Sequence, residues 1–270
     1  MNHLFDAAIL GTVQGLTEFL PVSSSGHLLL AHEFLNYEAG DSLTFDVALH
    51  IGTLIALLAY FWRDIVVLGR SWIQSFTVRP LTQAHRLPWL IGLAALPAAL
   101  AGAAFESFFE SMRNPWIVVA TFIIFGFIFL LVEHRRQEPT GTVETTTWKM
   151  ALGVGLAQVL ALVPGVSRSG VTIVAGLLAG FRRDQAARFT FLLSIPVVAG
   201  AAAKKMIDLK DAPPPADERA AMLLGIAVAA IVGYAVIRFL LKFLGKHRLD
   251  VFAYYRFGLA IVTAVALLAR

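Results

Sequence analysis

Six long apolar runs constrain what this chain can fold into more than any other feature of its sequence. A helix of about 20 apolar residues is long enough to cross the hydrocarbon core of a bilayer. Because backbone amides in lipid have no water to bond, each crossing segment must satisfy its own amides as a helix. We therefore expect six transmembrane helices, at about residues 45–62, 87–109, 115–133, 184–203, 220–243 and 251–269.

The composition is that of an integral membrane protein rather than a soluble one. Hydrophobic residues make up 58% of the 270 residues and charged residues only 15%, whereas a soluble domain carries about 25% charged residues. The runs cover most of the length, so residues 1–270 are expected to form a single membrane domain. The first residues lack the basic segment of a cleaved signal peptide. Cysteine is absent, which excludes disulfides and thiolate metal sites.

The positive charge of the chain lies mainly in the loops between the apolar runs. The formal net charge is +4 at pH 7. Short basic loops are typical of membrane topology and of contact with acidic headgroups, so we expect membrane lipids and no nucleic acid as partners. One set of loops carries thirteen Lys and Arg residues and the other set six. Since basic loops stay in the cytoplasm, this difference predicts that both termini lie outside.

Two further apolar regions are each broken in the middle by Pro, Gly and several Ser residues. Residues 6–35 contain PVSSSGH at residues 21–27, and residues 149–181 contain PGVSRSG at residues 164–170. Neither half of a broken region is long enough to cross a bilayer. Broken helices at membrane depth are tolerated where they are buried in protein or line a cavity. We therefore predict two re-entrant helical hairpins.

The two broken regions are related in sequence. Aligning residues 11–34 with residues 155–178, an offset of 144, gives eight identities in 24 positions. Inverted-topology repeats bring broken helices of this kind together near the membrane midplane. The expected fold is therefore an all-α integral membrane protein whose six transmembrane helices and two hairpins form an inverted repeat, with halves of about residues 1–133 and 134–270.

The differences between the two copies place unlike chemistry at equivalent positions. The second copy has Leu162, Arg168 and Val171 where the first has Glu18, Ser24 and His27. A packing element has no need to divide ionisable groups in this way, whereas a site shared between two repeats does. We therefore predict one active site to which both hairpins contribute.

Glu18 and Arg168 are the residues that point most directly to function. A carboxylate at membrane depth is costly unless it is paired, hydrated or bound to a metal. Glu18 is therefore a candidate catalytic residue and metal ligand, with Gln14 one helical turn before it. Arg168 begins a half-helix, where backbone amides favour an anion, and guanidinium groups match phosphate oxygens. The predicted phosphate cradle consists of Ser167, Arg168, Ser169, Gly170 and Thr172.

The first hairpin also carries candidates for the reaction itself. Ser24 is a candidate nucleophile, although a serine in this position also caps a helix. His27 is a candidate acid or base, and Ser23 and Ser25 are candidates for phosphate binding. Five other ionisable residues, near span ends or on helices, receive no individual role: Asp46, His50, Glu106, Arg238 and Arg256.

Both motifs resemble those of a known family. QGLTEFLPVSSSGH is similar to the (E/Q)xxxE and PVSSxGH motif of the undecaprenyl-pyrophosphate phosphatases of the bacitracin-resistance type, and PGVSRSGVT is similar to their PGxSRSxxT motif. The resemblance covers essentially the whole chain. It implies hydrolysis of undecaprenyl pyrophosphate to the monophosphate and inorganic phosphate in the bacterial cytoplasmic membrane, which recycles the lipid carrier for cell-wall synthesis.

The resemblance also implies site residues and a cofactor. Glu18, His27 and Arg168 match positions that are essential in the family, and a divalent cation, Mg²⁺ or Ca²⁺, is implied with Glu18 as a ligand. The first acid of the motif is here Gln14, and an amide cannot act as a base, so a proton role does not carry over to it. Other motif positions are matched by Ser24, Ser167, Ser169 and Thr172.

Several alternatives stay open at this point. Either Ser24 or a water molecule attacks the terminal phosphorus. A transporter or flippase of an anionic or isoprenyl-phosphate substrate would use the same repeat and cradle without chemistry. The membrane acid-phosphatase superfamily is disfavoured because Val174 stands where that family requires a histidine. A homodimer is one of the assemblies that the sequence leaves open.

Overall fold

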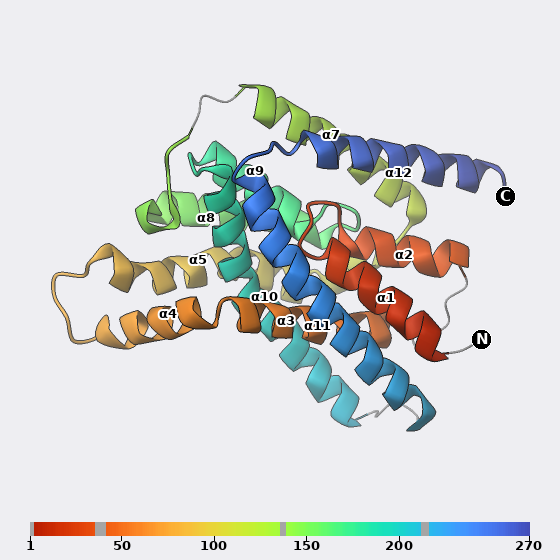
Figure 1. Cartoon of the computed structure of the whole chain (residues 1–270), viewed down its shortest axis with the longest axis horizontal. Helices are drawn as coiled ribbons and strands as arrows, with labels where there is room; N and C mark the ends of the chain where they lie inside the picture. Colours follow the sequence, from red (N-terminus) through yellow and green to blue (C-terminus); the bar gives the residue numbers. More distant parts are fainter. Residues whose placement is uncertain (1–2, 36–41, 136–138, 212–215) are drawn as a thin grey trace.

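The computed structural model describes residues 3–35, 42–135, 139–211 and 216–270, and across these ranges the chain is almost entirely helical (Figure 1). An isolated bridge between Gly141 and Phe181 is the β pairing found in those ranges. The elements, in chain order, are α1 His3–Thr17, α2 Ser24–Leu35, α3 Ser42–Tyr60, α4 Trp62–Gln74, α5 Gln83–Ala104, α6 Glu106–Ser111, α7 Pro115–Arg135, η1 Val143–Thr145, α8 Trp148–Val159, η2 Leu160–Leu162, α9 Arg168–Leu178, α10 Arg183–Asp211, α11 Ala216–Leu244 and α12 Asp250–Leu268.

The prediction of an all-α multi-pass membrane protein is confirmed for the described residues. Five helices are long and apolar enough to cross a membrane: α5, α7, α10, α11 and α12. The first predicted span, residues 45–62, falls on α3, and its residues Ala48–Tyr60 pass the same test together with α4. The two helices meet at an angle of 77°, so α3 and α4 are a bent pair. The span predicted at residues 87–109 also runs past Ala104, where α5 ends.

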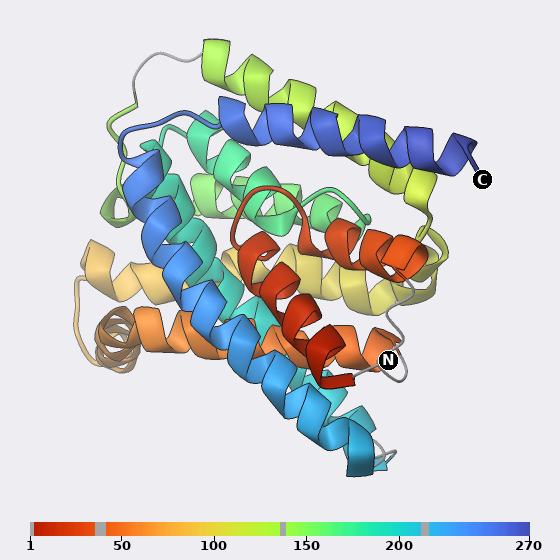
Figure 2. The ribbon, with the colours of Figure 1, turned by 45° about the vertical axis from the view of Figure 1, so that its right-hand side comes forward.

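The two broken regions form helix–loop–helix hairpins of short helices (Figure 2). The first consists of α1 and α2, and the second of α8, η2 and α9. The longest of these, α1, has 15 residues and is only about 22 Å long at 1.5 Å per residue. Each helix is therefore too short to cross a hydrocarbon core of about 30 Å.

Both hairpin loops hold their first serine in the same unusual backbone conformation. Ser23 and Ser167, which are 144 residues apart, have φ angles of 76° and 69°, a region that residues other than glycine rarely adopt. Each Oγ accepts a hydrogen bond from the amide three residues later, at 3.3 Å in the first loop and 3.1 Å in the second. The two loops thus share this serine geometry as well as part of their sequence. The division into halves at residues 1–133 and 134–270 stays a prediction.

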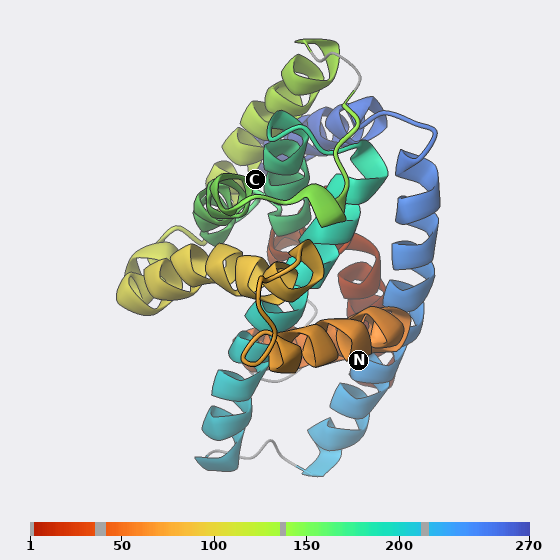
Figure 3. The same cartoon turned by 90° about the vertical axis from the view of Figure 1, so that its left-hand side faces the viewer.

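Each hairpin packs against a long helix from the other predicted half of the chain. Helix α1 lies on α11, and α8 lies on α5, two long helices on opposite sides of the bundle (Figure 3). A Cβ at Gly11 would lie 2.5 Å from the Gly225 oxygen, and a Cβ at Gly155 would lie 2.5 Å from the Ala94 oxygen. Gly11 and Gly155 are aligned in the repeat, and only glycine permits these approaches. With each hairpin packed on a helix of the other half, the two hairpin loops lie at one cavity.

Candidate active site

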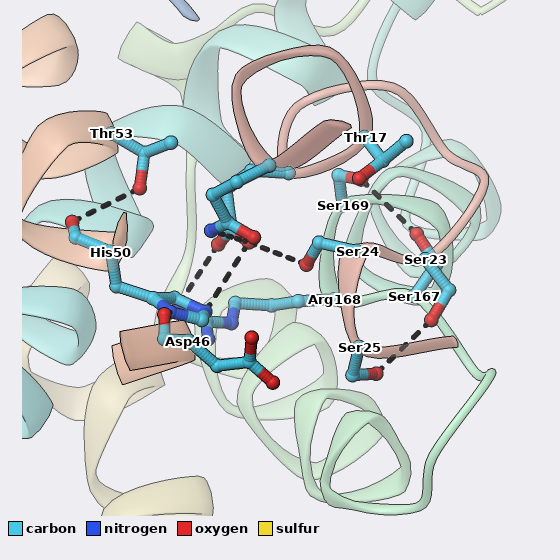
Figure 4. Close-up of polar contacts among 12 residues, drawn as sticks. Thr17, Ser23, Ser24, Ser25, Asp46, His50, Thr53, Ser167, Arg168 and Ser169 are labelled. Carbon is cyan, nitrogen blue, oxygen red and sulfur yellow. Dashed lines mark hydrogen bonds and ion pairs between the residues drawn. The ribbon is translucent and has the colours of Figure 1, made fainter. Parts of the chain in front are cut away.

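The two hairpin loops enclose a small polar cavity of about 70 Å³. Figure 4 shows side chains from three helices converging there: Ser24 from α2, His50 from α3 and Arg168 from α9. The cavity is lined by Glu18, Ser23, Ser24, Ser25, His50, Ala161, Ser167 and Arg168. Six of the eleven residues predicted for the site therefore line a single cavity.

Glu18 is the acidic centre of this cavity. The residue is only 9% exposed, and it follows α1 directly. Its Oε2 accepts a hydrogen bond from Ser24 Oγ at 2.6 Å and another from Gln14 Nε2 at 3.1 Å. The bond from Gln14 spans one helical turn, as the sequence spacing predicts. A hydroxyl that donates to a carboxylate at this distance is poised to lose its proton to it.

Arg168 faces Glu18 from the second hairpin. Its Nη1 lies 3.7 Å from Glu18 Oε1, too far for a hydrogen bond. This Nη1 atom is buried and has no hydrogen-bond partner. A buried donor without a partner is costly and calls for an acceptor that completes the site. Because guanidinium donors match phosphate oxygens, the geometry fits an anion held between Arg168 and the serines.

His50 belongs to the cavity although it lies in neither motif. Its Nε2 is 3.5 Å from Glu18 Oε2, and its Nδ1 lies 2.9 Å from the Asp46 carbonyl oxygen one helical turn earlier. A carbonyl oxygen only accepts, so Nδ1 carries the hydrogen and Nε2 is aimed at the carboxylate. The sequence offered a weak signal, a histidine inside an apolar run. Nothing local showed that α3 would bring it to Glu18.

Arg256 holds the two hairpin loops together from behind. Its side chain is 0% exposed. Nη1 donates to the Pro21 carbonyl oxygen at 3.2 Å and Nη2 to the Gly165 carbonyl oxygen at 2.5 Å. These two carbonyls occupy equivalent places in the two loops, 144 residues apart. Three phenylalanine rings of α7 surround the guanidinium at 5.1 to 5.9 Å: Phe122, Phe125 and Phe129.

Sequence reasoning left Arg256 without a role, although an arginine within a membrane span is itself a signal of function or structure. The other uncommitted residues lie away from the cavity lining. Asp46 is buried and lies 2.9 Å from His32 and 3.6 Å from Arg113. Glu106 and Arg238 are exposed, on α6 and α11 respectively.

Five predicted site residues do not line the cavity, and each has another contact. Gln14 supports Glu18, as described above. Ser169 Oγ donates to the Leu20 carbonyl oxygen at 3.0 Å, and Thr172 Oγ1 donates to the Arg168 carbonyl oxygen at 2.7 Å. The Gly170 amide donates to Ser167 Oγ. The His27 ring forms hydrogen bonds with the Ser23 carbonyl oxygen and the Tyr255 hydroxyl. These residues shape the loops around the cavity.

The residues present offer oxygen ligands rather than a complete metal cage. Among the described residues, no group of three or more His, Cys, Asp or Glu side chains is placed to hold a metal ion. Gln14 Oε1, however, is buried without a partner, beside the carboxylate of Glu18. Mg²⁺ commonly binds one or two carboxylates and completes its shell with water and substrate phosphates. The donor set therefore fits a hard divalent cation.

A larger cavity of about 490 Å³ lies elsewhere, between α4, α5, η1 and α10. Its walls include Asp64 and Arg188, which form an ion pair. None of the residues in the two motifs lines this space. The candidate active site is therefore the smaller cavity, where the paired carboxylate, hydroxyl and guanidinium meet.

Comparison with known proteins places the whole chain beside one family. Residues 7–262 match the family model described as "Bacitracin resistance protein BacA". The chain is 46% identical over 277 residues to a protein of Rubrobacter xylanophilus named "Undecaprenyl-diphosphatase", covering 99% of this chain and 100% of that one. Proteins of the same name from Geotalea daltonii and Pelobacter propionicus are 43% and 45% identical, each with 97% of both chains covered.

Replacing Arg256 by lysine is expected to lower thermal stability. A single ammonium cannot reproduce the two bonds of the guanidinium, and each buried carbonyl left without a donor costs about 1–3 kcal/mol. Thermal unfolding of the purified protein in detergent measures the loss. The exposed Arg238 provides the matched control, because Arg238→Lys should leave the unfolding temperature unchanged. We call the bonds of Arg256 to Pro21 and Gly165 the clamp. Equal unfolding temperatures for Arg256→Lys and the unaltered protein would show that the clamp is dispensable.

Proposed function

The chain belongs to the family of bacitracin resistance proteins, and we propose that it is a membrane phosphatase that hydrolyses undecaprenyl pyrophosphate to undecaprenyl phosphate and inorganic phosphate. The observation that carries this proposal is the hydrogen bond of 2.6 Å from Ser24 Oγ to Glu18, opposite the unpartnered Nη1 of Arg168. Phosphoryl transfer needs a nucleophile next to a base and a cationic group that donates hydrogen bonds to the phosphate, and these three residues provide them. The reaction recycles the lipid carrier of cell-wall synthesis and confers resistance to bacitracin.

Binding of the pyrophosphate falls to the second hairpin and to both helix ends. Helix α2 begins at Ser24 and α9 at Arg168, so two helix N-termini border the same cavity. Backbone amides and the helix dipole favour anions at such ends. Arg168 adds charged donors, and Ser23, Ser25 and Ser167 add hydroxyls at the cavity wall. The polar headgroup is thereby held against Glu18 and Ser24.

Two routes then lead to products. In one, Ser24 Oγ attacks the terminal phosphorus while Glu18 takes its proton. The bond from phosphorus to the bridging oxygen breaks, undecaprenyl phosphate leaves, and water later hydrolyses the phosphoserine. In the other route, a water molecule attacks directly and gives its proton to Glu18. Proximity favours Glu18 as the base in both routes, because its carboxylate contacts Ser24 and His27 does not line the cavity.

A divalent cation, Mg²⁺ or Ca²⁺, completes the proposal. Glu18 and the free Oε1 of Gln14 would hold it, and when bound it would neutralise the charge of the pyrophosphate. The amide of Gln14 already donates its Nε2 hydrogen to Glu18 at 3.1 Å. The carbonyl oxygen Oε1 has no partner of its own and is available as a neutral ligand.

A transporter or flippase is the second candidate, since an inverted repeat with broken helices builds transport sites in other folds. Binding alone has no use for a hydroxyl bonded to a carboxylate at 2.6 Å. The nucleophile and base pair therefore favours hydrolysis. A homodimer stays a prediction of the sequence.

We place the protein in the bacterial cytoplasmic membrane with both termini outside, on the strength of the loop charges. The lack of cysteine makes the orientation directly testable with single cysteines. Ser111→Cys, in the α6 helix, should react with a membrane-impermeant thiol reagent added outside intact cells. Thr77→Cys, in the turn after α4, should react only after the cells are opened. Both residues are exposed. The reverse pattern of labelling would overturn the orientation.

The purified protein in detergent should release phosphate from undecaprenyl pyrophosphate in the presence of Mg²⁺ or Ca²⁺, and a chelator should stop the release. Arg168→Ala and Glu18→Gln should each lower kcat by about 100-fold or more, because they remove transition-state donors or the base. Arg238→Ala, on the exposed face of α11, serves as the matched control. A pure transporter releases no phosphate. Retained activity in Arg168→Ala would exclude the proposed cradle.

Ser24→Ala separates the two chemical routes. If Ser24 is the nucleophile, the alanine variant loses turnover by several orders of magnitude, since no covalent intermediate forms. If water attacks, the variant keeps turnover close to that of the unaltered protein. Phosphate release under saturating substrate measures the difference. Ser25→Ala, which removes a neighbouring hydroxyl of the same wall, distinguishes loss of the nucleophile from loss of binding.

A further inference from the structure

A tyrosine of the last helix contacts the first hairpin through His27. Tyr255 lies on α12, and its hydroxyl is 2.7 Å from His27 Nε2. The two rings are stacked, with centroids 5.7 Å apart and planes inclined by 6°. On its other side, His27 lies near the ring of Phe122, with centroids 5.9 Å apart. Tyr255 is thus a partner that reaches His27 from outside both motifs.

The direction of each hydrogen bond follows from the acceptor at the far end. His27 Nδ1 lies 2.7 Å from the Ser23 carbonyl oxygen. A carbonyl oxygen only accepts, so Nδ1 carries the hydrogen. In the neutral ring, Nε2 is then the acceptor and the hydroxyl of Tyr255 is the donor. Tyr255 therefore favours the one tautomer of His27 that can donate to Ser23.

The peptide of Ser23 is where this chain of bonds ends, and it needs support. Its φ of 76° is a strained conformation for a residue with a side chain. In the second hairpin, Val171 stands at the position of His27. There the Ser167 carbonyl oxygen accepts only the Val171 amide, at 3.0 Å, among the bonds described. The first loop has an added side-chain bond, and it is the loop that carries Ser24.

We propose that Tyr255 is a positioning residue of the active site. It fixes the tautomer of His27, His27 fixes the Ser23 peptide, and the Ser23 peptide sets the direction of the Ser24 hydroxyl toward Glu18. Neither Tyr255 nor His27 lines the cavity, so both act through the loop rather than on the substrate. This inference rests on the proposed phosphatase function, because it assigns a role in that reaction.

Tyr255→Phe removes the hydroxyl and keeps the stacked ring, so the fold is preserved. We expect kcat for undecaprenyl pyrophosphate to fall by between about 10-fold and 100-fold, since small misplacements of reacting groups have effects of this size. KM should change by less than about twofold, because the cavity wall is retained. Tyr254→Phe is the matched control. Tyr254 is adjacent and exposed at 62%, and its loss should leave kcat unchanged.

A double-variant comparison tests whether Tyr255 acts through His27. Asparagine keeps an N–H donor near the place of Nδ1, so His27→Asn retains the bond to Ser23 and no longer depends on the tautomer. Adding Tyr255→Phe to His27→Asn should therefore cause no further loss of kcat. The proposal would be overturned if the fold-loss of kcat in the double variant equalled the product of the two single losses, or if Tyr255→Phe kept full activity.

Nitrogen NMR of the histidine-labelled, full-length protein gives a readout that is independent of activity. The His27 signals are identified as those lost in His27→Asn. Tyr255→Phe should shift the Nε2 resonance of His27, and Tyr254→Phe should not. An unchanged Nε2 resonance would refute the proposed hydrogen bond. If the unaltered protein releases no phosphate, the proposed function fails, while the resonance still shows whether Tyr255 bonds His27.

Discussion

A single buried guanidinium joins the two halves of the site. Each hairpin loop interrupts its helical region, and the carbonyl oxygens of Pro21 and Gly165 accept no backbone amide among the bonds described. Arg256 donates to both of these oxygens, so the same residue compensates for both breaks. The rings of α7 that enclose the guanidinium keep water out. Loop geometry, cavity and catalytic distances all depend on this contact, although Arg256 itself does not line the cavity.

Two hairpins of related sequence contribute different reactive side chains to the site. Ser23 and Ser167 share a positive φ, and the helix that follows each of them begins at the same cavity. The side chains then differ: one loop brings the Glu18 and Ser24 pair and the other brings Arg168. A single pyrophosphate has two unlike ends in the reaction, a phosphorus that is attacked and an oxygen that leaves. An arrangement with a base on one side and a cation on the other suits that polarity.

The parts of the site that the sequence predicted are those that lie close together in the chain. Glu18 and Ser24 were found because one loop carries both, and Arg168 because the second loop repeats the first. His50, Tyr255 and Arg256 lie on α3 and α12, and only tertiary packing brings them to the loops. Thr172, predicted as part of the cradle, does not line the cavity, and its hydroxyl donates to the backbone. Hydropathy likewise located α3 but not the bend between α3 and α4, because apolar length carries no information about direction.

The position of the clamp near the end of the chain has a consequence for biosynthesis. Arg256 follows Glu18 by 238 residues, and at about 5–20 residues per second its synthesis comes roughly 10–50 s later. For most of that interval the first hairpin has neither Arg256 nor the α11 surface that receives Gly11. The carboxylate of Glu18 is also made before Arg168, the guanidinium that faces it. The active site is therefore complete only when the last helix has been made.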